Sequence, residues 1–98
     1  LLWLRAHEPD VFARTRRVLL PKDWVRLRMT GEAVSEMSDA AGTLWLDVAR
    51  RAWSAEMLAL TGLNTTHMPH LVEGSEVSGR LRRAVARDWG VPDGIPVA

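Results

Sequence analysis

The sequence contains no cysteine and no long apolar run. Without cysteine there is neither a disulfide framework nor a thiolate metal site. The longest uninterrupted apolar runs are four residues, at 1–4 and 57–60, whereas a helix that crosses a bilayer needs roughly 20. Arg5 also follows the first run too early for that run to be the core of a signal peptide. These absences predict no membrane contact and a cytoplasmic location.

An excess of charge of one sign is missing as well. Thirteen basic side chains oppose twelve acidic ones, which leaves a formal net charge of +1. Such a balance creates no long-range field that would hold a polyanion, so we expect no nucleic-acid partner. Of the basic residues only Lys22 is a lysine.

The common signatures of catalysis and phosphate binding are also absent. The chain has no Gly-x-x-x-x-Gly-Lys-Ser/Thr loop, no Gly-x-Gly-x-x-Gly loop and no Gly-x-Ser-x-Gly elbow. Motifs therefore assign no catalytic residue and no cofactor-binding residue within these 98 residues.

What the chain does have is globular composition, with 47% hydrophobic and 26% charged residues. Its periodicity and its Gly, Pro and Ser positions predict mostly helix with short extended pieces between. Three helices are expected: one that Pro21 opens and Gly31 closes, one over 55–61 capped by Ser54, and one ended by Gly90. Residues 63–78 read mainly as loop, and residues 95–98 as an extended segment.

Two polar groups attract attention but favour plain interpretations. His67, His70 and Glu73 have the spacing of a metal site, yet Pro69 and Gly74 argue against the continuous helix that would present them together. We therefore expect a solvated loop and no metal site. Four arginines crowd the last helix, but acidic residues flank them, and a charged outer face is expected. The arginines are Arg80, Arg82, Arg83 and Arg87.

An alternative of a different class is a helix-turn-helix DNA-binding module over residues 36–53. Ala40-Ala41-Gly42 would form the turn and residues 44–53 the recognition helix. A recognition helix begins with polar groups that read base edges, whereas this segment begins with Leu44-Trp45-Leu46.

The five tryptophans are expected in the core or at interfaces rather than as stacking platforms. They are Trp3, Trp24, Trp45, Trp53 and Trp89.

Four blocks of sequence resemble, in one unbroken order, a region of the FGGY family of carbohydrate kinases. The blocks are Leu1–Pro9, Val18–Gly31, Ser35–Asp47 and Glu73–Gly79. The second block and the Ser38-Asp39-Ala40-Ala41-Gly42-Thr43 motif of the third are most similar to the xylulose-phosphorylating branch of the family. Together with two chain ends that look unlike natural termini, this resemblance leads us to expect a segment of a longer protein.

The resemblance implies an α/β parent fold, with two ribonuclease H-like domains of the actin and hexokinase superfamily. Residues 1–98 would be a single segment, the later part of the N-terminal domain. It further implies ATP-dependent phosphorylation of D-xylulose to D-xylulose 5-phosphate with Mg²⁺, or alternatively of another sugar or polyol. A homodimer of the parent is compatible with it. The general base, an Asp in the family, would follow Ala98, so the segment alone is expected to be inactive and to bind no ATP.

Within the family motif, Ser38, Asp39 and Thr43 are the residues most open to a role of their own. Short polar side chains at such positions commonly form hydrogen bonds to the local backbone and cap the following segment. We therefore expect these three residues to be structural. No catalytic, cofactor-binding or metal-binding residue is assigned.

Overall fold

A computed structural model describes the chain over residues 1–98, as six α-helices, one 3₁₀-helix and six very short strands. The N-terminal part is helical, with α1 over Leu2–His7, α2 over Pro9–Ala13 and α3 over Pro21–Thr30. Pro9 and Pro21 each stand at the first position of their helix, where a missing N–H costs nothing. Gly31 ends α3 with a φ of 89°, which glycine adopts without strain. The predicted helix from Pro21 to Gly31 is thus confirmed.

The middle of the chain alternates short strands and helices. The order is β1 (Val34–Glu36), α4 (Met37–Ala41), β2 (Leu46–Asp47), β3 (Ala52–Trp53), α5 (Ala55–Leu60), the 3₁₀-helix η1 (Thr65–His67) and β4 (His70–Val72). The Ser54 side chain accepts a hydrogen bond from the Met57 N–H, so the predicted cap of α5 is confirmed. Strands β2 and β3 form an antiparallel hairpin in which Leu46 faces Trp53.

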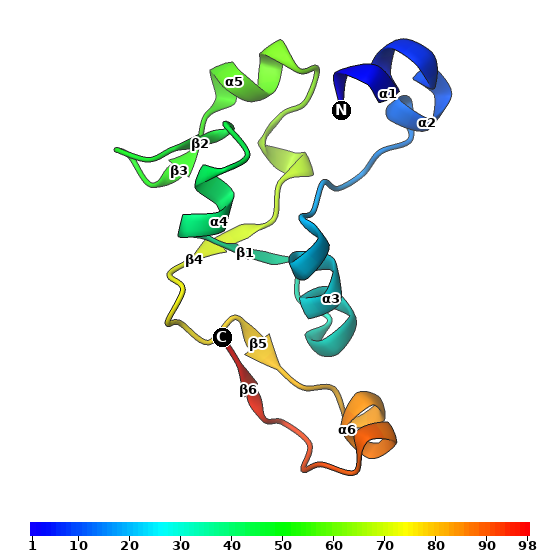
Figure 1. Cartoon of the computed structure of the whole chain (residues 1–98), viewed down its shortest axis with the longest axis vertical. Helices are drawn as coiled ribbons and strands as arrows, with labels where there is room; N and C mark the ends of the chain where they lie inside the picture. Colours follow the sequence, from blue (N-terminus) through cyan, green and yellow to red (C-terminus); the bar gives the residue numbers. More distant parts are fainter.

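The pairing of β1 with β4 is the main non-local feature of the fold. The two strands run parallel, with Val34 opposite His70 and Glu36 opposite Val72. Within residues 63–78 only η1 and the three-residue strand β4 are regular, so the prediction that this stretch is mainly loop is confirmed. The helix α3 leads directly into β1 and lies beside it (Figure 1).

The C-terminal part forms a small lobe that contacts the end of α3. Strand β5 (Gly79–Arg80) pairs antiparallel with β6 (Pro96–Val97), and α6 (Arg83–Trp89) fills the connection between them. Gly90 ends α6 in the left-handed conformation, as predicted, and the predicted extended end of the chain is β6. Figure 1 shows this lobe at the opposite end of the long axis from α1, α2 and α5.

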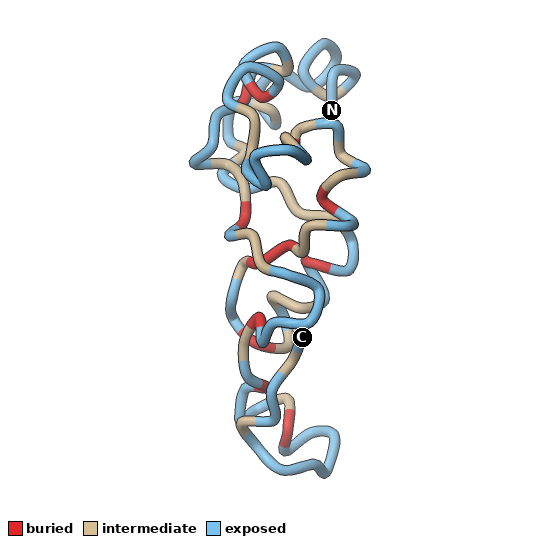
Figure 2. Tube along the Cα trace, turned by 90° about the vertical axis from the view of Figure 1, so that its left-hand side faces the viewer, coloured by how far each residue is buried: buried red, intermediate tan, exposed pale blue.

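Burial in the chain is sparse. Only 12 of 98 residues are buried, and Figure 2 shows them at several separate points along the long axis. The radius of gyration is 15.2 Å, against roughly 13 Å for a compact domain of this length. Trp3, Trp24 and Trp89 are more than half exposed, so their predicted place in a core is wrong, although an interface role stays a prediction.

The helix-turn-helix alternative does not survive the structure. Its supposed recognition helix, residues 44–53, contains the two strands of the β2–β3 hairpin instead. Leu44 and Arg51 both have positive φ, at 66° and 53°, which a continuous right-handed helix excludes.

None of the helices has the length and the apolar composition that a membrane-spanning helix requires.

Candidate functional site

A compact group of charges lies where the start of α3 meets β1 and α4. Asp23 is in the first turn of α3 and is fully buried, which is rare for a carboxylate without a partner. Its partner is Lys22, whose Nζ lies 2.7 Å from Oδ1. The same Nζ lies 3.2 Å from Asp39 Oδ2 and 3.9 Å from Glu36 Oε1. We call Lys22, Asp23, Glu36 and Asp39 the Lys22 cluster.

The Lys22 cluster joins segments that are distant in sequence, because α3 supplies two members and the β1–α4 junction the other two. Its members differ in solvent exposure: the side chain of Asp23 is 0% exposed, that of Glu36 15% and that of Asp39 46%. A second cation, Arg26, stands one turn along α3 with Nη1 3.9 Å from Asp23 Oδ1. The most buried carboxylate is thus the one nearest to the two cations.

Glu36 caps α4. Its Oε2 accepts hydrogen bonds from the N–H and the hydroxyl of Ser38, at 2.8 and 2.7 Å, and its Oε1 accepts one of 2.8 Å from the N–H of Asp39. The Ser38 hydroxyl is the largest cause that holds the pKa of Glu36 below its ordinary value of 4.5. Partial burial opposes it, while the two N–H groups and the charge of Lys22 lower the pKa further.

The three residues singled out from the sequence lie in or beside α4, but they act differently from one another. Thr43 donates to the carbonyl of Ala40 and accepts from the N–H of Trp45, so it shapes the turn locally. Ser38 donates to Glu36 rather than to the backbone. Asp39 makes no side-chain hydrogen bond to the turn; its carboxylate faces Lys22. The cap that we expected from this motif is supplied by Glu36.

Lys22, Asp23 and Glu36 are the three members of this site that sequence reasoning missed. Glutamate is not among the preferred N-cap residues, which hides it from a search for Ser, Thr, Asp or Asn. The sequence does carry a signal for this cap, because Glu36 directly precedes a short helical run and stands two residues before a serine. Lys22 was noticed as the only lysine, but its approach to Asp39 spans 17 positions and has no local signature.

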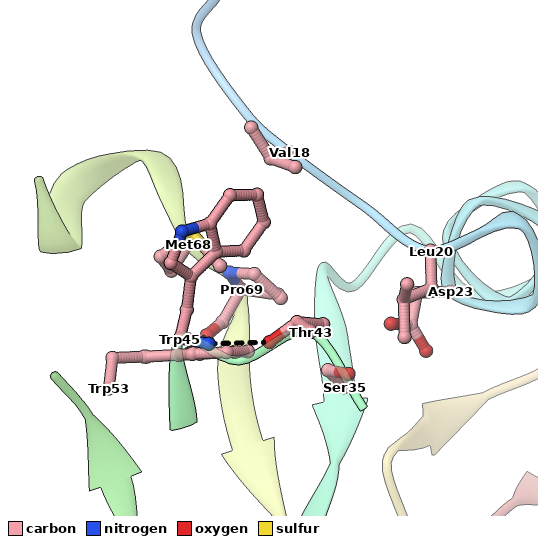
Figure 3. A pocket seen from close by; sticks show the side chains of 9 residues that line it. All are labelled: Val18, Leu20, Asp23, Ser35, Thr43, Trp45, Trp53, Met68 and Pro69. Atoms are coloured by element: carbon pink, nitrogen blue, oxygen red, sulfur yellow. Dashed lines mark hydrogen bonds between the residues drawn. The ribbon is translucent and has the colours of Figure 1, made fainter. Parts of the chain in front are cut away.

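A small cavity lies behind the Lys22 cluster. About 20 Å³ is available in it to the centre of a water molecule. Figure 3 shows its walls, which are apolar on one side and polar at Asp23, Ser35 and Thr43. Trp53 closes one wall and is itself fixed by a 2.8 Å hydrogen bond from Nε1 to the carbonyl of Pro69.

The other polar groups singled out from the sequence are not brought together. His67 Nδ1 accepts from the N–H of Asn64 and completes the cap of η1, while His70 and Glu73 lie in and after β4. No group of three or more His, Cys, Asp or Glu residues could hold a metal ion. Three of the four arginines bind nearby groups: Arg80 the carbonyl of Gly94, Arg82 that of Arg28, and Arg83 the carboxylate of Asp93.

Comparison with known proteins gives one consistent result. The N-terminal domain of the FGGY family of carbohydrate kinases matches residues 1–98. The chain is 59% identical over 97 residues to a xylulose kinase of Klebsiella pneumoniae and 57% identical over 97 residues to one of Escherichia coli. Each match covers 99% of this chain, which spans about a fifth of the length of these relatives.

A solved structure agrees with these relatives. The crystal structure of a "xyloylose kinase" from Brucella ovis superimposes with a TM-score of 0.94 at 55% identity, over 99% of this chain and 20% of that one. Together with the family match, this superposition confirms the predicted fold class, an α/β sugar-kinase fold of the actin and hexokinase type to which this chain contributes helices and short strands.

Proposed function

Because this chain belongs to the FGGY family of carbohydrate kinases, we propose that the full-length protein transfers phosphate from ATP to D-xylulose, giving D-xylulose 5-phosphate. The observation that carries the proposal is the 59% identity over 97 residues to a xylulose kinase. The match covers 99% of this chain, so it includes the region of the Ser38–Thr43 motif, which by resemblance distinguishes this branch of the family.

The segment's own part in this activity is structural. Phosphoryl transfer needs positioned Mg²⁺, a phosphate cradle and an oriented nucleophile. The chain has no phosphate loop of the two common types and no group of three or more His, Cys, Asp or Glu side chains that could hold a metal ion. We therefore assign Mg²⁺, ATP and the general base to residues outside 1–98, and place this segment in the later part of the N-terminal domain. Ser38 bonds to Glu36 at the start of α4, Thr43 orders the turn after α4, and Asp39 pairs with Lys22.

The remaining parts of the proposal concern location and partners. We propose a cytoplasmic enzyme that acts on a small sugar. The near-neutral charge of this segment supports the expectation that it binds no nucleic acid. Sedimentation of the full-length protein tests the homodimer that the family resemblance allows.

A coupled assay of ADP formation tests the proposal. The purified full-length protein is given Mg²⁺ and ATP with D-xylulose, D-ribulose or glycerol in parallel. We expect kcat/KM for D-xylulose to exceed that for the other two at least about tenfold, since specificity is a ratio of such values. Chelation of Mg²⁺ with EDTA should abolish turnover, and added Mg²⁺ should restore it. A preference for glycerol or D-ribulose would overturn the assignment of substrate and leave the family unchanged.

A further inference from the structure

Leu44, in the turn between α4 and β2, combines two unfavourable features. Its φ is 66°, in the left-handed region where the side chain of an L-residue lies too close to its own backbone. The side chain is also 75% exposed, the largest fraction among the exposed large apolar side chains of the chain. Asparagine or glycine would adopt this backbone with less strain and would expose less apolar surface. The turn alone therefore gives no reason for a leucine at this position.

Hydrogen bonds on both sides hold Leu44 in this conformation. The hydroxyl of Thr43 donates to the Ala40 carbonyl at 2.7 Å and accepts from the Trp45 N–H at 3.2 Å. The indole Nε1 of Trp45 donates to the Thr61 hydroxyl at 3.2 Å, which ties the turn to the end of α5. Strained backbone that its surroundings impose in this way clusters at sites of binding and function. The leucine side chain is thus presented at a fixed place on the surface.

A second exposed leucine belongs to the same region. Leu60, the last residue of α5, is 71% exposed and directly precedes Thr61. Leu44 directly precedes Trp45, and the side chains of Trp45 and Thr61 are joined by the hydrogen bond just described. The two most exposed of the large apolar side chains therefore flank one contact between the turn and α5. Single exposed apolar residues need no explanation, whereas apolar residues that gather in one region mark a contact surface.

We propose that Leu44 is an apolar anchor whose side chain, in the full-length protein, is buried against the part of the same polypeptide that lies outside residues 1–98. This chain spans only about a fifth of the length of its relatives, so the remainder of the polypeptide is the largest source of covering surface. Burial of the side chain offsets the strain of its backbone. The inference rests on the chain being part of a longer protein and is independent of the substrate.

The sign of a stability change in the full-length protein tests this anchor. If Leu44 were exposed there, Leu44→Asn would relieve strain and leave the midpoint of thermal unfolding unchanged or higher. Burial reverses the sign, because the variant loses apolar contacts and places an amide in the interface without a partner. We expect Leu44→Asn to lower the midpoint by at least about 3 °C, and Leu44→Met, which keeps the apolar volume, to stay within about 2 °C of wild type. An unchanged or raised midpoint in Leu44→Asn would overturn the proposal.

Arg51→Asn is the matched control for the backbone conformation. Arg51 is the other non-glycine residue with a positive φ, at 53°, and its ion pair with Glu73 is half exposed. Relief of strain and loss of that pair should leave the midpoint within about 2 °C of wild type. An equal fall in both variants would assign the loss to the backbone and overturn the proposal. If Leu44→Asn does not fold, a crystal structure of the wild-type full-length protein decides: Leu44 open to solvent, or packed on a second copy, would overturn it as well.

Discussion

At the scale of single residues, Lys22 contacts three carboxylates, those of Asp23, Glu36 and Asp39. Lys22→Met removes the cation nearest to the fully buried Asp23. Loss of one partner of a buried pair costs about 3–5 kcal/mol, and we expect roughly 1–3 kcal/mol here because Lys22 is 39% exposed. Thermal unfolding of the full-length protein measures the loss.

Asp39→Ala is the matched control for Lys22→Met. It breaks the 3.2 Å ion pair of Lys22 with Asp39 but leaves Asp23 paired. Because Asp39 is nearly half exposed, the cost should stay below about 1 kcal/mol. Equal losses of stability in Lys22→Met and Asp39→Ala would contradict the interpretation that Lys22 stabilises the fold mainly through its ion pair with Asp23.

Glu36 gives the site a dependence on pH. Its pKa is lowered in the folded protein, chiefly by the Ser38 hydroxyl. Its carboxylate therefore contributes stability above the pKa of the unfolded chain, and that contribution is lost as the pH falls through the folded pKa. Glu36→Gln should cost about 0.5–2 kcal/mol at pH 7, in the range of a lost cap.

The measurement compares the unfolding midpoints of wild type and Glu36→Gln between pH 7 and about 2.5, because the contribution is lost only below the ordinary pKa of 4.5. The difference should shrink toward the acid end. Glu56→Gln serves as control, because Glu56 is exposed and its side chain accepts no hydrogen bond. A Glu36→Gln difference that does not change with pH would mean that the carboxylate charge is unimportant to the cap.

At the scale of elements, the contact of β5 with the end of α3 depends on a glycine. A Cβ added at Gly79 would lie 2.9 Å from Cβ of Thr30, and Thr30 is buried with its hydroxyl bonded to the Arg26 carbonyl. Gly79→Ala should therefore destabilise by about 1–3 kcal/mol, the usual cost of overpacking. Gly74→Ala, whose Cβ would meet only Glu36 at 3.5 Å, should change stability by less than about 0.5 kcal/mol. Similar unfolding midpoints for the two variants would show that α3 and β5 separate easily.

The elements also show which parts of the fold a sequence can predict. Helix α3 was predictable because Pro21 and Gly31 mark its two ends locally. The pairing of Val34 with His70 was not, since it joins positions 36 residues apart with no pattern in either. The hydrogen bonds of Thr43 join near neighbours in the chain, whereas the contact between Lys22 and Asp39 joins distant positions and was not foreseen.

At the scale of the whole molecule, the chain presents apolar side chains that a self-sufficient domain would cover. Trp24 and Trp89 are 56% and 59% exposed and line a shallow groove between α3 and α6. We predict that the rest of the full-length protein shields these tryptophans. In acrylamide quenching, the isolated segment should be quenched more strongly than the full-length protein. Variants that retain only Trp24 or only Trp89 report on each residue separately. Equal quenching of Trp24 and of Trp89 in the isolated segment and in the full-length protein would contradict this prediction.

We propose that residues 1–98 support a sugar kinase whose chemistry lies elsewhere in the full-length protein. The turnover of D-xylulose by full-length Asp39→Asn, measured at a temperature where the variant is folded, tests this proposal. Asn keeps the size of the side chain and loses only its pairing with Lys22, so kcat should stay within about tenfold of wild type. Loss of a general acid or base costs about 10²–10⁴-fold, and a folded Asp39→Asn enzyme slowed by that much would place the active site within this segment.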